Sequence, residues 1–145
     1  MKYLIDGDEA ILGRVGSRVA KLLIEGNEVA LINAEKIRIT GHIPDLAAKY
    51  KRLIELKDRA NPEHSPFYSR RPDLFVKRSI RGMLPYKQPK GKDAYKLLKV
   101  YMGDAKDIKE AKTYTIKDVK AKKAGDAFEN SVSVLELVEK LGYKK

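Results

Sequence analysis

A dense run of cations between Phe67 and Lys92 is the part of this sequence best suited to chemistry with another molecule. Of these 26 residues eight are Arg or Lys, and the only acidic residue is Asp73. Eight positive charges against one negative leave a net charge of +7, out of +11 for the whole chain. Like charges at this density repel one another unless a polyanion neutralises them, so the segment predicts an anionic partner. The cations are Arg70, Arg71, Lys77, Arg78, Arg81, Lys87, Lys90 and Lys92.

A phosphate backbone is the anionic partner that fits this segment best. Each phosphate that a Lys or Arg neutralises releases counterions, and arginine planes can also stack on exposed bases. Arginine predominates early in the segment, which favours forked hydrogen bonding to phosphate. Stacking on bases is one explanation for the interleaved Phe75 and Tyr86, and burial in the protein is at least as good a one. No aromatic strand motif that reads bases is present, so backbone and shape contacts are expected.

A solvated surface is the alternative explanation for any run of charge. Against it, the spacing places Lys77, Arg78 and Arg81 close together on a predicted helix that begins at Pro72 and ends at Leu84. A solvated helix normally includes Glu one turn away from its cations, and this helix has none. We therefore expect the eight cations to contact the phosphates of a nucleic acid.

A second candidate anion site is the Gly13–Ser17 segment, which the pattern places at a strand-to-helix junction. Free amides at the start of a helix can hold an anion. The spacing of Gly13 and Gly16 matches neither common nucleotide-binding motif, so close packing of the helix on the sheet is the favoured interpretation. Arg14 and Arg18, one turn apart, are additional candidate phosphate contacts.

The sequence offers no good candidate for catalysis or metal binding. His42 and His64 have no cysteine or second histidine nearby, so a metal site is not expected. His42 either bonds to an RNA base or caps the helix that follows it, and capping is the favoured role. The serines lack a nucleophile-elbow context and the carboxylates mostly lie beside Lys or Arg, as in surface pairs. We expect no enzyme, no cofactor and no small-molecule substrate.

Length and composition restrict the protein to one charged domain. The chain has 145 residues, of which 43% are apolar and 35% are charged. A pI near 9.7 agrees with a nucleic-acid partner. No apolar run approaches the roughly 18 residues of a membrane-spanning helix, and the first residues lack the pattern of a secretion signal. The absence of cysteine suits a cytoplasmic protein.

The apolar pattern predicts strands that alternate with helices, which favours an α/β domain with a mainly parallel sheet. Residues 29–32 are apolar on both alternating faces, as expected for a strand covered by helices on both sides. Strands are expected at residues 3–5, 29–32, 37–39, 100–101 and 113–116.

Helices are predicted from apolar residues at helical spacing and from their end signals. The first carries Leu12, Val15, Val19 and Leu22 and is closed by Gly26. In the last, Ser133 and Glu136 form a capping box and Gly142 follows the end. A short helix is marked by Ala94, Leu97 and Leu98. A long helix beginning near Pro44 is expected to bury Ile43, Leu46, Ala47, Tyr50, Leu53 and Ile54.

Several segments together resemble the ribosomal protein L-thirteen family of the large subunit, in its archaeal and eukaryotic form. They are LGRVGSRVAKLL from Leu12, VALINAEKIRITG from Val29, and RGMLPYKQPKGKDAYKLLKVYMG from Arg81. The most specific part is RGMLP, followed by a basic loop and LKVYMG. Residues 104–107 lack the histidine-containing stretch of the bacterial form, which indicates the archaeal type.

The resemblance implies a three-layer α/β fold around a mostly parallel four-stranded sheet, in a single domain of residues 1–145 with a basic RNA-binding segment at 67–92. It also implies a non-enzymatic role in the cytoplasmic ribosome, where the protein binds large-subunit ribosomal RNA, contacts neighbouring ribosomal proteins and supports assembly. Gly82 and Pro85 are expected to shape the backbone of the RNA-facing block. That block consists of Arg78, Arg81, Gly82, Met83, Leu84, Pro85, Lys87, Lys90, Gly91 and Lys92.

Two other functions remain open from the sequence. One is a translational regulator that binds messenger RNA outside the ribosome. The other, less favoured, is a nucleotide-using enzyme built on the turn at Gly13–Gly16.

Overall fold

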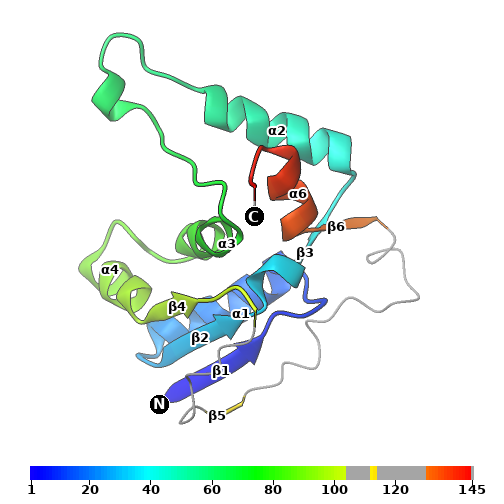
Figure 1. Cartoon of the computed structure of the whole chain (residues 1–145). Coiled ribbons are helices and arrows are strands. Elements are labelled where there is room, and N and C mark those ends of the chain that lie inside the picture. Colours follow the sequence, from blue (N-terminus) through cyan, green and yellow to red (C-terminus); the bar gives the residue numbers. More distant parts are fainter. Residues whose placement is uncertain (104–111, 114–129, 145) are drawn as a thin grey trace.

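A parallel sheet forms the base of the protein. The computed structural model describes residues 1–103, 112–113 and 130–144. Three strands lie side by side in the order β4-β2-β1, and β2 pairs in parallel with both neighbours (Figure 1). Together with the helices this confirms a mixed helix and strand fold with a parallel sheet. The three strands are β1 (Lys2–Asp6), β2 (Glu28–Ile32) and β4 (Leu98–Val100).

The outer edge of β1 carries a short additional pairing. Tyr3 and Leu4 pair in parallel with β5 (Lys112–Thr113), which has two residues. Residues 114–116, the rest of the strand predicted there, lie outside the described residues. The described structure therefore supports three full parallel strands.

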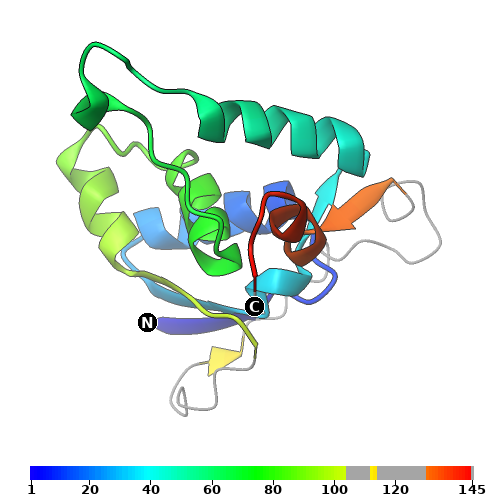
Figure 2. The same cartoon turned by 45° about the horizontal axis from the view of Figure 1, so that its top comes forward.

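The two faces of the sheet have different surroundings. Register places Tyr3, Val29 and Leu98 on one face, and the described helices cover that face (Figure 2). The prediction that helices cover both faces of β2 is thus confirmed for one face only among the described elements. On the other face, Ala30 and Ile32 are half-buried. The fully buried strand residues are Ile5, Val29, Leu31 and Leu98, and the half-buried apolar residues of the other face are Leu4, Ala30 and Ile32.

Helix α1 (Leu12–Ile24) connects β1 to β2 and packs against β2. After its last turn Gly26 has φ +87, and the amide of Asn27 donates to the carbonyl of Leu22 at 3.1 Å. Glycine adopts this left-handed conformation without the strain that a side chain would add, so Gly26 ends the helix as predicted. Leu23 is fully buried, whereas Leu22 is half-buried.

Six further elements follow β2 and precede β4 along the sequence. Helix α3 begins at Pro72 as predicted, but it ends at Arg81 rather than at Leu84. It packs against both α1 and β4 and buries Val76 and Ile80. These elements are η1 (Ala34–Lys36), β3 (Arg38–Thr40), α2 (Ile43–Glu55), η2 (Pro62–His64), α3 (Pro72–Arg81) and α4 (Pro89–Lys96).

Helix α4 corrects the prediction of a basic loop followed by a short helix at Ala94–Leu98. The helix begins at Pro89, and Leu98 already belongs to β4. Proline suits the first helical position, because the amide that it lacks would have no partner inside the helix. The basic stretch around Lys90 and Lys92 is therefore helical.

Helix α2 is less buried than its apolar stripe predicts. None of its residues is buried, and all six predicted core positions are half-buried. The helix contacts α6 at one end of the molecule (Figure 1). Among the described residues no helix is both long and apolar enough to cross a membrane.

The C-terminal part of the chain forms a second, two-stranded sheet with β3 and then a final helix. Strand β6 (Ser131–Ser133) pairs antiparallel with β3 and leads into α6 (Val134–Lys140). The amide of Glu136 donates to Oγ of Ser133 at 3.2 Å, and the amide of Ser133 donates to Oε2 of Glu136 at 3.3 Å. This confirms the predicted capping box, and Gly142 follows the helix with φ +94.

Candidate nucleic-acid interface

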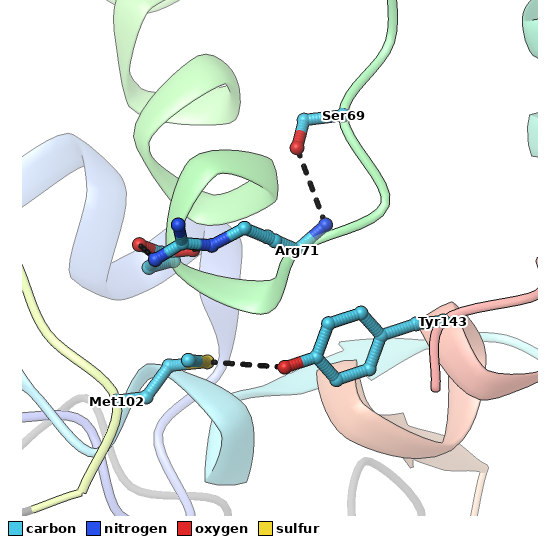
Figure 3. A network of polar contacts seen from close by, with 5 residues as sticks. Ser69, Arg71, Met102 and Tyr143 are labelled. Carbon is cyan, nitrogen blue, oxygen red and sulfur yellow. Dashed lines mark hydrogen bonds and ion pairs between the residues drawn. The ribbon is translucent and has the colours of Figure 1, made fainter. Parts of the chain in front are cut away.

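The start of α3 fixes the first cation of the basic segment. Arg71 precedes the helix and makes a bidentate contact with Asp73, with Nε–Oδ1 and Nη2–Oδ2 distances of 3.2 and 2.8 Å. Its amide donates to Oγ of Ser69 at 3.2 Å, as Figure 3 shows. The Asp73 side chain is only 13% exposed, so this ion pair stabilises the helix start. Arg71 is therefore already neutralised within the protein.

Arg78 is held by the segment that precedes α3. Its Nη1 donates to the carbonyl of Phe67 at 2.7 Å. Its guanidinium carbon lies 3.9 Å from the centre of the Tyr68 ring, which is a cation–π distance. Neither partner cancels its charge, so Arg78 is oriented and still cationic.

Two further cations of α3 lie over a pair of tyrosine rings. Lys77 Nζ lies 5.1 Å from the centre of the Tyr95 ring, and the guanidinium carbon of Arg81 lies 5.1 Å from that of Tyr86. The two rings meet edge to face, with centres 5.5 Å apart. Burial raises the pKa of the Tyr95 phenol, while nearby Arg81 acts in the opposite direction. Tyr86 and Tyr95 form a tyrosine platform that sets the positions of Lys77 and Arg81.

Tyr95 is the member of this platform that sequence reasoning missed. It lies outside the 67–92 segment, and no local spacing connects it with Lys77. The two meet because the chain turns after α3 and α4 brings Tyr95 back toward Lys77. Of the aromatics named from the sequence, Phe75 is buried and Tyr86 is 38% exposed.

The cations of α4 are exposed, and their backbone is fixed by a close approach. A Cβ atom at Gly91 would overlap the carbonyl oxygen of Pro85, so the helix can lie this close to the preceding turn only with glycine. Gly82 has an ordinary helical φ of −64 and no such tight contact. Gly91, rather than Gly82, is thus the glycine on which the shape of this block depends. Of the basic segment, Lys90 and Lys92 lie on α4 and Lys87 lies just before it, and all three are exposed.

The guanidinium of Arg70 lies near Gly142, just after α6. A Cβ atom built at Gly142 would lie 3.5 Å from Nη1 of Arg70. The C-terminal end of a helix dipole is negative, which favours a cation near the end of α6. Nearby, the hydroxyl of Tyr143 and the sulfur of Met102 lie 4.0 Å apart (Figure 3).

Most cations of the basic segment have no ion-pair partner among the described residues. Within the described residues, seven of its eight cations have no carboxylate within 4.0 Å, and Arg71 is the exception. Rings and carbonyl oxygens orient several of these cations without neutralising them. The segment is therefore a surface prepared for an anion that the protein itself does not supply.

The Gly13–Ser17 segment begins at the second residue of α1, the helix that follows β1, so it lies in the first turns of that helix rather than in the turn before it. A Cβ atom at Gly16 would lie 2.6 Å from the sulfur of Met83, which supports close packing as the role of this glycine. The packing partner is the end of α3 rather than the sheet. Arg14 and Arg18 are exposed on α1 and have no partner for their guanidinium groups among the described residues.

The histidines give no support to other chemistry. His42 occupies the N-cap position of α2, but its side chain makes no capping hydrogen bond, so the predicted capping role is wrong. No group of three His, Cys, Asp or Glu side chains suitable for a metal occurs in the described ranges.

The chain is similar to known proteins over most of its length. Residues 1–107 match the family described as Ribosomal protein L13. A large ribosomal subunit protein uL13 from Methanocaldococcus jannaschii is 45% identical over 106 residues, covering 72% of this chain and 77% of that protein. The uL13 protein of Methanosarcina barkeri is 39% identical over 142 residues, covering 97% and 98%. That of Archaeoglobus fulgidus is 36% identical over 141 residues, covering 97% and 88%.

Proposed function

The chain belongs to the ribosomal protein L13 family, and from this premise we propose that its basic segment at residues 67–92 binds large-subunit ribosomal RNA. As a member of this family the protein is a structural constituent of the large ribosomal subunit in the cytoplasm, and it is not an enzyme. Its partners are ribosomal RNA and other ribosomal proteins.

The observation that carries the proposal is a set of oriented cations without carboxylate partners. Lys77 and Arg81 on the tyrosine platform, and Arg78 on Tyr68, are held in place before any partner arrives. Side chains that are already ordered lose less entropy when they bind. Phosphates in the RNA backbone supply the missing negative charge.

Individual roles follow from these surroundings. Arg71 contributes least among the cations of the segment, because Asp73 already neutralises it. Arg14 and Arg18 add weaker contacts from α1, since nothing in the described structure orders their guanidinium groups. The phosphate contacts of the basic segment are assigned to Arg70, Arg71, Lys77, Arg78, Arg81, Lys87, Lys90 and Lys92.

The finer fold also belongs to this proposal. Residues 1–145 form one three-layer α/β domain around a mostly parallel four-stranded sheet. The half-buried Leu4, Ala30 and Ile32 support this arrangement, because apolar residues on an uncovered face would otherwise remain in water. Within the subunit, the domain supports assembly by joining RNA segments to neighbouring ribosomal proteins.

A regulator that binds messenger RNA outside the ribosome is the remaining alternative. Sedimentation of large subunits through gradients of high salt separates the two functions. An integral constituent stays with the subunit, whereas a loosely bound regulator is left at the top of the gradient. Loss of the protein from large subunits under conditions that retain other constituents would contradict the proposal.

A further inference from the structure

A cavity of about 220 Å³ lies between α2, α3 and the segment that carries Tyr68. Typical small-molecule sites have volumes of roughly 300–1,000 Å³, so a dinucleotide cofactor does not fit here. The volume suits a single ring system. Five of the residues that line the cavity, Tyr50, Tyr68, Phe75, Arg78 and Ser79, define its chemistry.

Flat surfaces form much of the wall. The rings of Tyr50 and Phe75 pack edge to face, with centres 4.9 Å apart and an angle of 65° between their planes. Tyr68 contributes a third ring, and the Arg78 guanidinium lies against it at 3.9 Å. Aromatic faces and arginine planes are the surfaces on which unpaired bases stack.

Two hydrogen bonds hold residues of the wall in place. Arg78 binds the carbonyl of Phe67 at 2.7 Å, and Ser79 Oγ donates to the carbonyl of Phe75 at 3.1 Å. Tyr50 lines the cavity, and its hydroxyl has no hydrogen-bond partner among the described residues. The cavity is thus formed before anything binds.

The positive charge at the cavity favours a ring that belongs to an anionic ligand. Arg78 lines the cavity, Arg70 lies on the segment beside it, and neither has a carboxylate partner within the described residues. An anionic chain that carries planar rings can stack on the aromatic walls and neutralise the two arginines. Phe67, next to Tyr68, is 82% exposed and offers a further flat face outside the cavity.

We propose that this cavity receives one unpaired base of ribosomal RNA, stacked against its aromatic wall and bonded at its edge to the Tyr50 hydroxyl. The inference rests on the proposed function, since it adds one base contact to the phosphate contacts made by the cations. It makes part of the binding dependent on RNA structure, because only a splayed base can enter.

Filling the cavity tests the proposal. Binding of the full chain to transcripts of large-subunit ribosomal RNA is measured at several salt concentrations for wild type and for Ser79→Leu. Loss of a stacked base is expected to weaken binding by about 5- to 150-fold. The dependence on salt should not change, because a base contact releases no counterions. Ser17→Leu is the matched control, since Ser17 also bonds to a backbone carbonyl on its own helix but lies on α1.

The outcomes separate this inference from the proposed function. If wild type does not bind the transcripts, the proposed function fails. If wild type binds and folded Ser79→Leu binds equally well, only the base cavity is refuted. A reduced salt dependence in Ser79→Leu also refutes it, since the phosphate contacts would then be disturbed. Normal binding to transcripts with loss of Ser79→Leu protein from large subunits would mean that a protein fills the cavity, which again refutes the inference.

A second variant keeps the test decisive if Ser79→Leu does not fold. Tyr50→Phe removes one hydroxyl and preserves the ring contact with Phe75. Loss of a hydrogen bond to a base edge is expected to weaken binding by about 2- to 12-fold. Equal affinity of Tyr50→Phe and wild type would overturn the assignment.

Discussion

Helices α1 and α3 pack against each other on the same face of the sheet, yet they hold their cations in different ways. On α1, Arg14 and Arg18 extend into solvent with no partner for their guanidinium groups among the described residues. On α3, Lys77 and Arg81 lie over the rings of Tyr95 and Tyr86. Two helices with similar charge can therefore differ in the side-chain entropy that their cations lose when an anion binds.

Removing the cations in pairs gives the largest expected difference between the helices. Lys77→Gln with Arg81→Gln should weaken binding to ribosomal RNA transcripts by about a hundredfold, since a hydrogen bond to a charged group contributes roughly 1.5 kcal/mol or more. Arg14→Gln with Arg18→Gln should cost about tenfold or less, because these side chains lose more freedom on binding. Filter binding at constant salt measures both.

The control for that comparison is a pair of lysines on the other face of the sheet. Lys2 and Lys99 share that face by register, away from α3. Replacing both with Gln removes the same charge and should leave affinity nearly unchanged. A loss as large as that of the α3 pair would mean that net charge, rather than position, governs binding.

Glycine substitutions test how the cation-bearing helices are positioned. Gly91→Ala should lower the free energy of unfolding by about 1–3 kcal/mol, because the new methyl group meets the backbone of Pro85. Gly16→Ala should cost less, since the atom it meets belongs to the flexible side chain of Met83, which is 40% exposed. Urea denaturation measures both changes.

Gly13→Ala provides the reference for this series. Nothing lies within 4 Å of a Cβ atom at Gly13, and the residue is helical. Alanine there should stabilise the protein by up to about 1 kcal/mol. Equal effects of Gly91→Ala and Gly13→Ala would show that the contact with Pro85 does not matter.

The tyrosine platform should have a smaller effect. Tyr86→Leu should weaken RNA binding by about 2- to 5-fold, because an exposed cation–π contact contributes roughly 0.5–1 kcal/mol. Tyr86→Phe retains a ring beneath Arg81 and should bind like wild type. If both variants lose affinity equally, the hydroxyl rather than the ring is the important group.

The smallest expected effect is a dependence of stability on high pH. Burial raises the pKa of Tyr50 above its ordinary value of 10.0. Because the folded-state pKa exceeds the unfolded-state value, this stabilisation is fully present below about pH 10 and is lost as pH rises through the folded-state pKa. Between about pH 9 and pH 11, the unfolding free energy of wild type should fall more steeply than that of Tyr50→Phe. Parallel curves would contradict this origin.

Local signals in the sequence were sufficient where one short segment determines the structure. The capping box of Ser133 and Glu136 and the glycine after α1 depend on residues within a few positions of each other, and both predictions are confirmed. The strands β1 and β2 follow equally from their apolar runs.

Features that depend on distant residues were not predictable in the same way. The contact between Lys77 and Tyr95 needs the turn at Pro85 and the helix that follows it. The ion pair of Arg71 with Asp73 also escaped prediction, since composition counts charges without saying which of them meet. Half-burial of α2 depends on how much of its face α6 covers, which its own periodicity cannot specify.

The salt dependence of RNA binding tests most directly whether the oriented cations of α3 contact phosphates. A double logarithmic plot of affinity against salt should lose a slope of about 1.5 in the Lys77→Gln, Arg81→Gln variant, because two phosphate contacts disappear. An unchanged slope in that variant, with its fold intact, would contradict the account.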